Sequence, residues 1–211
     1  ASLNTARKAG IRALTLSEGD ELIAVMKTDG KQDILLASAN GMVICFNEND
    51  VRCMGRDAAG VRGISLNEGD YVVGAEKMEE GKTLLTLTEN GYGKRTALPE
   101  YLRTGPDGEK IPQSRGGKGL KNYNITPKTG NIAGCRVVGD NDDVMIIENG
   151  GVIIRVPAAS INVYKRDVQG VIVMRFKEEG DQVISMALAE HEEAPAPETA
   201  EVPTPVENAD E

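Results

Sequence analysis

The seven residues 113–119, Gln-Ser-Arg-Gly-Gly-Lys-Gly, combine the chemical groups that bind phosphate. Arginine forks onto phosphate oxygens and lysine adds a point charge. Glycine lets backbone N–H groups approach an anion closely. The stretch therefore predicts a phosphate-binding corner, built from the cations Arg115 and Lys118 and from the glycines Gly116, Gly117 and Gly119.

Three looser copies of this stretch, which we call a box, occur elsewhere in the sequence. Each has a basic residue, a short linker and a glycine, followed directly by an apolar run; the copies are residues 7–10, 56–60 and 166–170. The box arginines are Arg7, Arg56, Arg115 and Arg166, and they are 49, 59 and 51 residues apart. This spacing indicates a repeat of about 50 residues.

Two further landmarks follow the same period. The segment 20–25 returns as 70–75, weakly as 130–135 and clearly as 181–186. An Asn-Gly pair occurs at 40–41, 90–91 and 149–150. Three independent landmarks with one period make chance resemblance a poor explanation.

Each repeat reads as four short strands. In the second repeat these are residues 61–66, 71–75, 83–88 and 92–96. Asn-Gly between two apolar runs predicts a hairpin, with both residues at the positive φ of a type I′ turn. Four strands per repeat of about 50 residues are typical of a propeller blade. We therefore expect an all-β, propeller-like fold over residues 1–187 with an incomplete set of blades.

The long interval between the second and third boxes contains an insertion. Residues 103–112 are polar and broken by glycine and proline, which predicts an exposed loop. This insertion would place box 113–119 on or beside a protruding segment.

The net charge of −9 is concentrated at the C-terminal end. Residues 188–211 hold eight acidic residues and no lysine or arginine, so residues 1–187 carry a net charge of −1 and all 24 cations. The end segment is rich in Glu, Pro and Ala and cannot bury enough apolar surface to become ordered. We expect residues 188–211 to be a disordered acidic tail.

Side-chain catalysis is not expected. The one histidine, His191, lies in the acidic tail, which argues against Ser/His and Cys/His nucleophiles. Cys45, Cys53 and Cys135 lack metal-ligand spacing and are expected to be free thiols in a reducing cytosol. We expect no catalytic residue, metal site or cofactor in this chain, and the sequence has no apolar run long enough to span a membrane.

Boxes repeated around the rim of a propeller would form a curved cationic track. A DNA duplex that follows the track would bend, and repeated phosphate contacts would offset the cost of bending. The expected contacts are led by Arg115, Lys118 and Lys121, with the box glycines, and continue with Arg56, Arg62, Lys94, Arg95, Lys165 and Arg166. In the alternative reading, the weaker boxes are only turns, and their arginines pair with carboxylates.

The sequence resembles the C-terminal domain of the A subunit of DNA gyrase. Residues 53–64 and 90–96 look like the repeat signatures of that family. Residues 113–119 are similar to its box, Gln-Arg-Arg-Gly-Gly-Lys-Gly, with Ser114 where the family has arginine. The resemblance covers about residues 5–187 and is shared with the A subunit of topoisomerase IV.

The resemblance implies a β-pinwheel, a propeller-like fold whose blades exchange strands and whose basic rim wraps double-stranded DNA. Six blades are usual in the family, so the four boxes here imply about half to two-thirds of a domain. The family places its box in the first blade, whereas box 113–119 is followed by one further repeat and resembles the corner of a late blade.

The resemblance also implies a parent enzyme, a type II DNA topoisomerase, and its partners. The parent would introduce negative supercoils with ATP and Mg²⁺ bound by other domains or subunits, in an A2B2 assembly with the B subunit. It would work in the bacterial cytoplasm, at the nucleoid. Two alternatives stay open: a topoisomerase IV domain that guides DNA, and a protein-interaction propeller without a nucleic-acid role, which the near-neutral charge favours.

Overall fold

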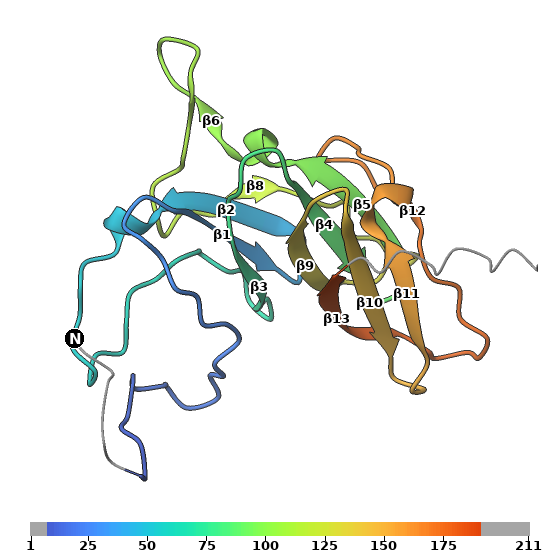
Figure 1. The fold of residues 1–211 in the computed structure, drawn as a ribbon, viewed down its shortest axis with the longest axis horizontal. Coiled ribbons are helices and arrows are strands. Elements are labelled where there is room, and N and C mark those ends of the chain that lie inside the picture. The colour runs from blue at the N-terminus through green and yellow to red at the C-terminus, as the bar shows by residue number, and fades with distance from the viewer. Residues whose placement is uncertain (1–7, 191–211) are drawn as a thin grey trace, which may run out of the picture.

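A computed structural model describes residues 8–190 and shows three twisted antiparallel sheets of three or four strands, which we call blades 1 to 3 (Figure 1). In sheet order, blade 1 contains β3 (Val72–Lys77), β1 (Asp33–Ser38), β2 (Met42–Asn47) and β8 (Leu120–Lys121). Blade 2 contains β9 (Ile132–Val138), β4 (Thr83–Thr88), β5 (Tyr92–Ala97) and β12 (Val171–Ile172). Blade 3 contains β13 (Val183–Glu190), β10 (Asp142–Glu148) and β11 (Ile153–Pro157). The all-β prediction is therefore confirmed.

Each blade is assembled from strands of different repeats. The hairpin β1–β2 pairs on one side with β3, from the next repeat, and on the other with β8, from the repeat after that. The hairpin β4–β5 pairs in the same manner with β9 and β12. This is the strand exchange that the resemblance implied. Blade 3 has the hairpin β10–β11 and the strand β13.

The hairpin turns differ from the predicted type I′. Asn40 and Asn90 do not adopt positive φ, whereas Gly41 and Gly91 have φ of 82° and 77°. The N–H of Gly41 donates to the carbonyl of Ser38 at 3.0 Å. This is the three-residue loop in which a glycine bulge follows the turn. The positive φ is borne by glycine alone because glycine lacks the Cβ that opposes it.

The third hairpin is offset by one residue from its predicted position. Its positive-φ glycine is Gly151, at φ 89°, and the N–H of Gly151 donates to the carbonyl of Glu148 at 3.1 Å. The residues that match Asn40-Gly41 are therefore Gly150-Gly151, and not Asn149-Gly150. The turn geometry therefore places this hairpin one residue later than the Asn-Gly pair predicted.

The core lies between the faces of neighbouring blades. Side chains alternate along β4, so Leu84 packs toward blade 1, while Leu85 and Leu87 pack toward blade 3. Blade 2 is thus buried on both faces, and even the polar residues Thr86, Lys94 and Thr96 of its hairpin are fully buried. A third cluster on the other face of blade 1 contains Ile34, Ile44, Phe46 and Ile64.

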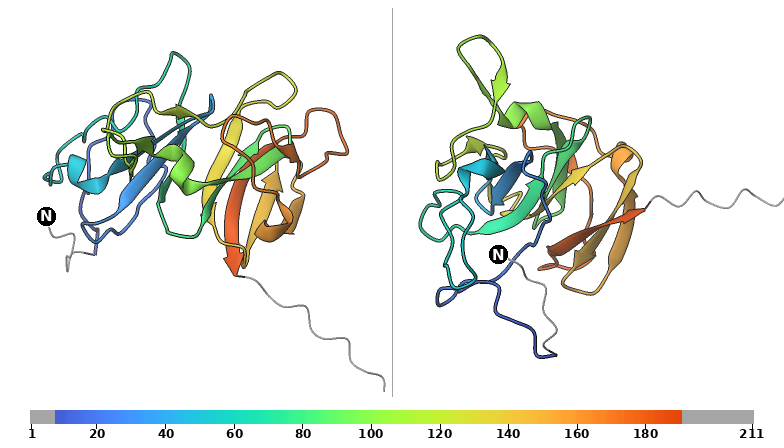
Figure 2. Two further views of the ribbon diagram at one scale, coloured as in Figure 1. Left: turned by 90° about the horizontal axis from the view of Figure 1, so that it is seen from above. Right: turned by 60° about the vertical axis from the view of Figure 1, so that its left-hand side comes forward.

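The inner strands converge on a common axis. A polar cavity of about 200 Å³ is lined by residues at the same position of four repeats: 23–24, 73–75, 133–136 and 184–186. The four repeats are therefore related by rotation about this cavity, as in a propeller. Figure 2 shows the blades arranged as an open arc rather than a closed ring.

The first inner segment lies beside the axis but is not a strand. Residues 20–25 were predicted to be strand-like, yet they have no strand pairing, and Val25 is 82% exposed. Each of the three blade hairpins among residues 8–190 already pairs with a later inner strand, so none is left for this segment. Likewise the predicted run 61–66 has no regular pairing, and Val61 and Leu66 are exposed.

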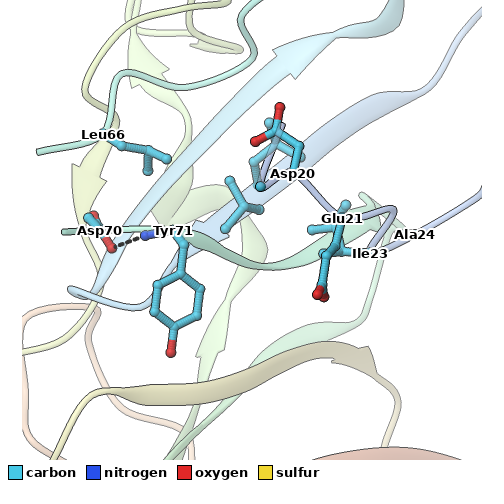
Figure 3. Close-up of a pocket in the computed structure, with 11 residues that line it drawn as sticks. Asp20, Glu21, Ile23, Ala24, Leu66, Asp70 and Tyr71 are labelled. Carbon is cyan, nitrogen blue, oxygen red and sulfur yellow. Dashed lines mark hydrogen bonds between the residues drawn. The ribbon is translucent and has the colours of Figure 1, made fainter. Parts of the chain in front are cut away.

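A hollow of about 590 Å³ separates residues 19–24 from blade 1. Asp20 and Glu21 approach it from one side, and Asp70 and Tyr71 from the other (Figure 3). The carboxyl of Asp70 accepts hydrogen bonds from the N–H groups of Asn40 and Tyr71, each at 2.9 Å. The charged residues of this lining are acidic, so the hollow does not suit phosphate.

The predicted insertion forms a short hairpin. Strand β6 (Arg103–Thr104) pairs with β7 (Lys110–Ile111), and this hairpin projects from the body of the molecule (Figures 1 and 2). The 3-10 helices η1 (Glu48–Asp50), η2 (Leu98–Tyr101) and η3 (Ala158–Ser160) follow β2, β5 and β11 at equivalent positions. The insertion is therefore exposed, as predicted, and leads directly into box 113–119.

The last strand extends three residues past the predicted domain boundary at 187. Strand β13 continues to Glu190, and Leu188 and Ala189 pair with Val144 and Asp143. The rest of the predicted tail, from 191 to 211, lies outside the described residues, as do Arg7 and His191. No helix among residues 8–190 is long and apolar enough to cross a membrane.

Candidate nucleic-acid interface

Residues 113–119, which we call box 3, lie along strand β2 of blade 1. The N–H of Gln113 donates to the carbonyl of Cys45 at 2.7 Å, and β8 then pairs with β2. Gly119 ends the box at φ 75°, and a Cβ there would lie 2.5 Å from the carbonyl oxygen of Val43. Glycine is therefore required at this position twice over, by its φ and by the close approach.

Box 4 lies on blade 2 in the same way. The N–H of Tyr164 donates to the carbonyl of Arg95 at 2.8 Å, and β12 pairs with β5. Gly170 has φ 76°, and a Cβ there would overlap the carbonyl of Gly93. Box 4 therefore spans residues 164–170, position for position with box 3, and starts two residues earlier than predicted.

Successive boxes are linked to one another. The N–H and the hydroxyl of Ser65 donate to the carbonyls of Gly117 and Gly116, at 2.8 and 2.9 Å. Thr15 makes the corresponding contact with residues 56–60, which we call box 2, because its hydroxyl donates to the carbonyl of Asp57 at 3.3 Å. The boxes therefore form a row, in which each one contacts the chain that follows the box before it.

Sequence analysis did not identify Ser65 and Thr15. Each lies five residues after a positive-φ glycine, Gly60 or Gly10. A repeat alignment on these glycines would have shown a hydroxyl side chain at the same position twice. The signal in the sequence is therefore an uncharged hydroxyl side chain at a fixed distance after the glycine that ends a box.

Five of the predicted cations face solvent. They are Arg56, Arg62, Lys118, Lys121 and Lys165. The Nζ of Lys121 donates to the side-chain carbonyl of Asn124 at 2.9 Å. Within residues 8–190, none of the five forms an ion pair with a carboxylate. The alternative in which the box cations are neutralised by carboxylates is therefore not what the structure shows.

Lys94 was predicted to contact DNA, but it is fully buried. Its Nζ donates to the carbonyls of Lys165 and Arg166 at 2.8 and 2.5 Å, and lies 5.2 Å from the ring centroid of Tyr123. Burial lowers the pKa of Lys94 to about 8, and the charges of Asp167 and Glu100 oppose the shift. Lys94 therefore stabilises the backbone of box 4 from the protein interior and cannot reach a ligand.

Arg95 is also inside the protein, 6% exposed. Its Nε donates to the carbonyl of Ile161 at 2.7 Å, and its Nη1 pairs with the carboxylate of Asp140 at 2.5 Å. Both errors have one cause, because the Lys-Arg pair lies on β5, a strand of the blade that is buried on both faces.

Arg115 and Arg166 have an intermediate position. Both are partly exposed, and both donate to backbone carbonyls. The Nη1 of Arg115 lies 2.6 Å from the carbonyl oxygen of Arg62, and the Nη1 of Arg166 lies 2.9 Å from that of Lys121. Of the box glycines, Gly117 is exposed, while Gly116 and Gly119 are partly covered.

The described residues contain no cluster of three His, Cys, Asp or Glu side chains that could hold a metal ion. Cys45, Cys53 and Cys135 are free, as predicted. Burial raises the pKa of the Cys45 and Cys135 thiols to about 12, so both are neutral. The chemistry of this surface is therefore that of exposed cations and backbone groups.

The family model described as "DNA gyrase C-terminal domain, beta-propeller" matches residues 2–29, 32–77, 82–111, 109–139 and 142–190. The chain belongs to this family. The matches 32–77 and 142–190 each run from a hairpin through a box to the inner strand that pairs with that hairpin, and together the matches cover nearly all of the described structure.

Relatives agree with the family assignment. The A subunit of DNA gyrase from Clostridium acetobutylicum is 43% identical over 97% of this chain and 24% of its own length. That from Klebsiella oxytoca is 40% identical over 87% of this chain and 20% of its own length. The chain thus spans about a fifth to a quarter of these relatives.

Two solved structures share the fold. One is the C-terminal domain of DNA topoisomerase IV, with TM-score 0.78 and 26% identity over 89% of this chain and 56% of that chain. The other is the DNA gyrase A C-terminal domain, with TM-score 0.72 and 26% identity over 86% of this chain and 58% of that chain.

Proposed function

We propose that this chain binds double-stranded DNA along its row of boxes and bends the duplex, as part of the A subunit of a gyrase. The observation that carries this proposal is the repeated corner. In boxes 3 and 4, a positive-φ glycine and the two-residue strand that follows it hold the backbone against a blade. Exposed cations flank each of these boxes, and they have no carboxylate partner among residues 8–190. Family membership supports the same reading.

The chemistry is phosphate neutralisation without catalysis. Each lysine or arginine that contacts a phosphate releases a condensed counterion, which favours binding at low salt and carries no sequence preference. Because the boxes are related by rotation about the central cavity, a duplex that follows them curves. Repeated phosphate contacts along the row offset the energy of bending.

The parent enzyme extends this proposal. Within the gyrase, the domain would present duplex to a catalytic core that introduces negative supercoils using ATP and Mg²⁺ held elsewhere. Its partners would be the B subunit and the remainder of the A subunit, in an A2B2 assembly in the bacterial cytoplasm, at the nucleoid. The sequence relatives at 40–43% identity favour gyrase over topoisomerase IV.

A salt titration tests the proposal. The affinity of the chain for a labelled linear duplex should fall linearly on a log–log plot against salt concentration, with a slope of about −0.9 for each phosphate contacted. Five exposed cations therefore predict a slope of roughly −4 to −5. A slope near zero, or no binding at low salt, would overturn the proposal and favour a protein-interaction propeller.

A second measurement separates the two enzyme families. The complete assembly that contains this domain should introduce negative supercoils into relaxed circular DNA in the presence of ATP. Relaxation alone would assign the domain to a topoisomerase IV instead.

A further inference from the structure

Two box arginines make the same unusual contact. The guanidinium of Arg115 donates to the carbonyl of Arg62, and that of Arg166 donates to the carbonyl of Lys121. Both arginines lie four residues before the positive-φ glycine of their own box. Both acceptors lie two residues after the glycine of the preceding box. The contact is therefore a property of the repeat and not of a single site.

The residues that supply the acceptor carbonyls are themselves exposed cations. Arg62 and Lys121 turn their side chains to solvent while their carbonyls face the arginine of the next box. Both acceptors are neutral backbone carbonyls, so the contact does not neutralise the charge of the guanidinium. What the hydrogen bond fixes is the backbone that carries the neighbouring cation.

Arginine suits this role better than lysine. Its planar guanidinium presents several donors in a rigid fork, whereas an ammonium is a single point. Arg115 uses the fork on two carbonyls, because its Nε also donates to the carbonyl of Asp50 at 3.2 Å. It thereby joins box 3, the segment after box 2 and the end of η1.

We infer that two of the box arginines, Arg115 and Arg166, are positioning residues, which set the spacing and direction between successive phosphate-binding cations. The phosphates are contacted by the five exposed cations, Arg56, Arg62, Lys118, Lys121 and Lys165. This assignment rests on the proposed function. It distinguishes the side chains that contact phosphate from the arginines that fix the relative positions of those side chains along the curved row.

Box 2 provides an internal contrast. Arg56 occupies the same position as Arg115 and Arg166, is exposed, and makes no such carbonyl contact with residues 8–190. The hydroxyl contact of box 2, from Thr15, is also longer than that of Ser65 in box 3, at 3.3 Å against 2.9 Å. A rim segment without the arginine contact is thus more loosely joined.

The test compares two measurements on the full chain. The salt slope of duplex binding counts the phosphate contacts. Energy transfer between dyes at the two ends of a bound duplex reports how far the duplex is bent. Arg115→Lys keeps the charge but removes the fork. We expect it to leave the salt slope within error of the wild type and to lower the end-to-end energy transfer. Arg166→Lys should do the same independently.

Lys118→Gln is the matched control in the same box. It removes a cation proposed to contact phosphate, so the slope should become shallower by about 0.9. If Arg115→Gln makes the slope shallower by the same amount, or if Arg115→Lys bends DNA as the wild type does, the positioning role is wrong. A wild-type slope of zero would instead reject the proposed function itself. Circular dichroism and the urea midpoint confirm that each variant is folded.

Discussion

Box 3 and box 4 have the same backbone but carry lysines at different positions, since Lys165 of box 4 is exposed where box 3 has Ser114. Each begins with an N–H that donates to the second strand of a blade hairpin, β2 or β5, and each ends at a glycine with φ near 75°. Box 3 carries Lys118 on its outer surface, where box 4 has Gln169. Box 4 has Lys94 beneath it, where box 3 has Ile44, which packs close to Gly117. The repeat therefore fixes the corner and leaves the charge to vary.

This difference separates two uses of a lysine near a phosphate-binding loop. An exposed lysine is available to a ligand, whereas a buried lysine binds carbonyls and strengthens the loop. A count of cations near the boxes treats both alike, and only their burial distinguishes them. Three sets of variants test whether the two corners differ in this way.

The largest effect is expected from the glycines that end the boxes. Gly119→Ala and Gly170→Ala should each lower the free energy of unfolding by about 2–3 kcal/mol, because alanine opposes the positive φ and its Cβ overlaps a carbonyl. Gly60→Ala, at φ 90° with nothing within 4 Å of its Cβ, should cost only about 1 kcal/mol. Urea denaturation measures all three. Equal losses would show that the boxes are not held on their blades.

The next effect concerns the buried lysine and its pH dependence. Between pH 8 and the ordinary lysine pKa of about 10.4, the folded chain has released the Lys94 proton that the unfolded chain still holds. The unfolded state then binds more protons, so this group makes the free energy of unfolding rise with pH. The rise is at most about 1.4 kcal/mol per pH unit. Lys94→Met should lose it.

The buried thiols of Cys45 and Cys135 contribute with the opposite sign above their ordinary pKa, because they stay protonated in the folded state. The measurement is therefore the difference between wild type and Lys94→Met in urea unfolding from pH 7.5 to 10. Ile44→Met, at the same position beneath box 3, is the matched control and should keep the wild-type profile. A constant difference across this range would contradict the lowered pKa.

The smallest effect is a transfer of charge between the two corners. Lys118→Gln should weaken duplex binding at 0.1 M salt and make the log–log salt slope shallower by about 0.9, and Gln169→Lys should strengthen binding and steepen the slope by a similar amount, since each changes one phosphate contact. Lys118→Gln should change the free energy of unfolding by no more than about 0.5 kcal/mol, because Lys118 is exposed. Gln169 is half-buried and its Nε2 donates to the hydroxyl of Thr126 at 3.1 Å, so Gln169→Lys should in addition lose this hydrogen bond, at a cost of about 1 kcal/mol. No gain from Gln169→Lys would indicate that box 4 lies off the path of the duplex.

The repeat, the hairpins and the row of boxes were accessible from the sequence, because each rests on glycine or on local periodicity. The four-strand blade followed from the same landmarks. The burial of Lys94 and Arg95 was not accessible, because it depends on two neighbouring blades that cover β5 from both sides. The same Lys-Arg pair on a solvent-exposed edge strand would present two exposed cations.

Strand assignment failed where a partner was needed. Residues 20–25 have the same pattern as β3, and the pattern alone predicts a strand. Within residues 8–190 no hairpin is left for it, so the backbone groups of this segment have no sheet to join. Local propensity favours a strand, and a paired neighbour is what makes it one.

The exchange of strands between repeats has a consequence for how the chain acquires its structure. Blade 1 begins with β1 at Asp33 but is completed only when β8, at Leu120 and Lys121, joins its edge. Blade 2 likewise waits for Val171 and Ile172. A growing chain on a ribosome therefore holds an unfinished sheet edge while more than one further repeat is synthesised. Interlocked blades of high contact order should form late and together, unlike the repeats of a solenoid, which can fold one by one.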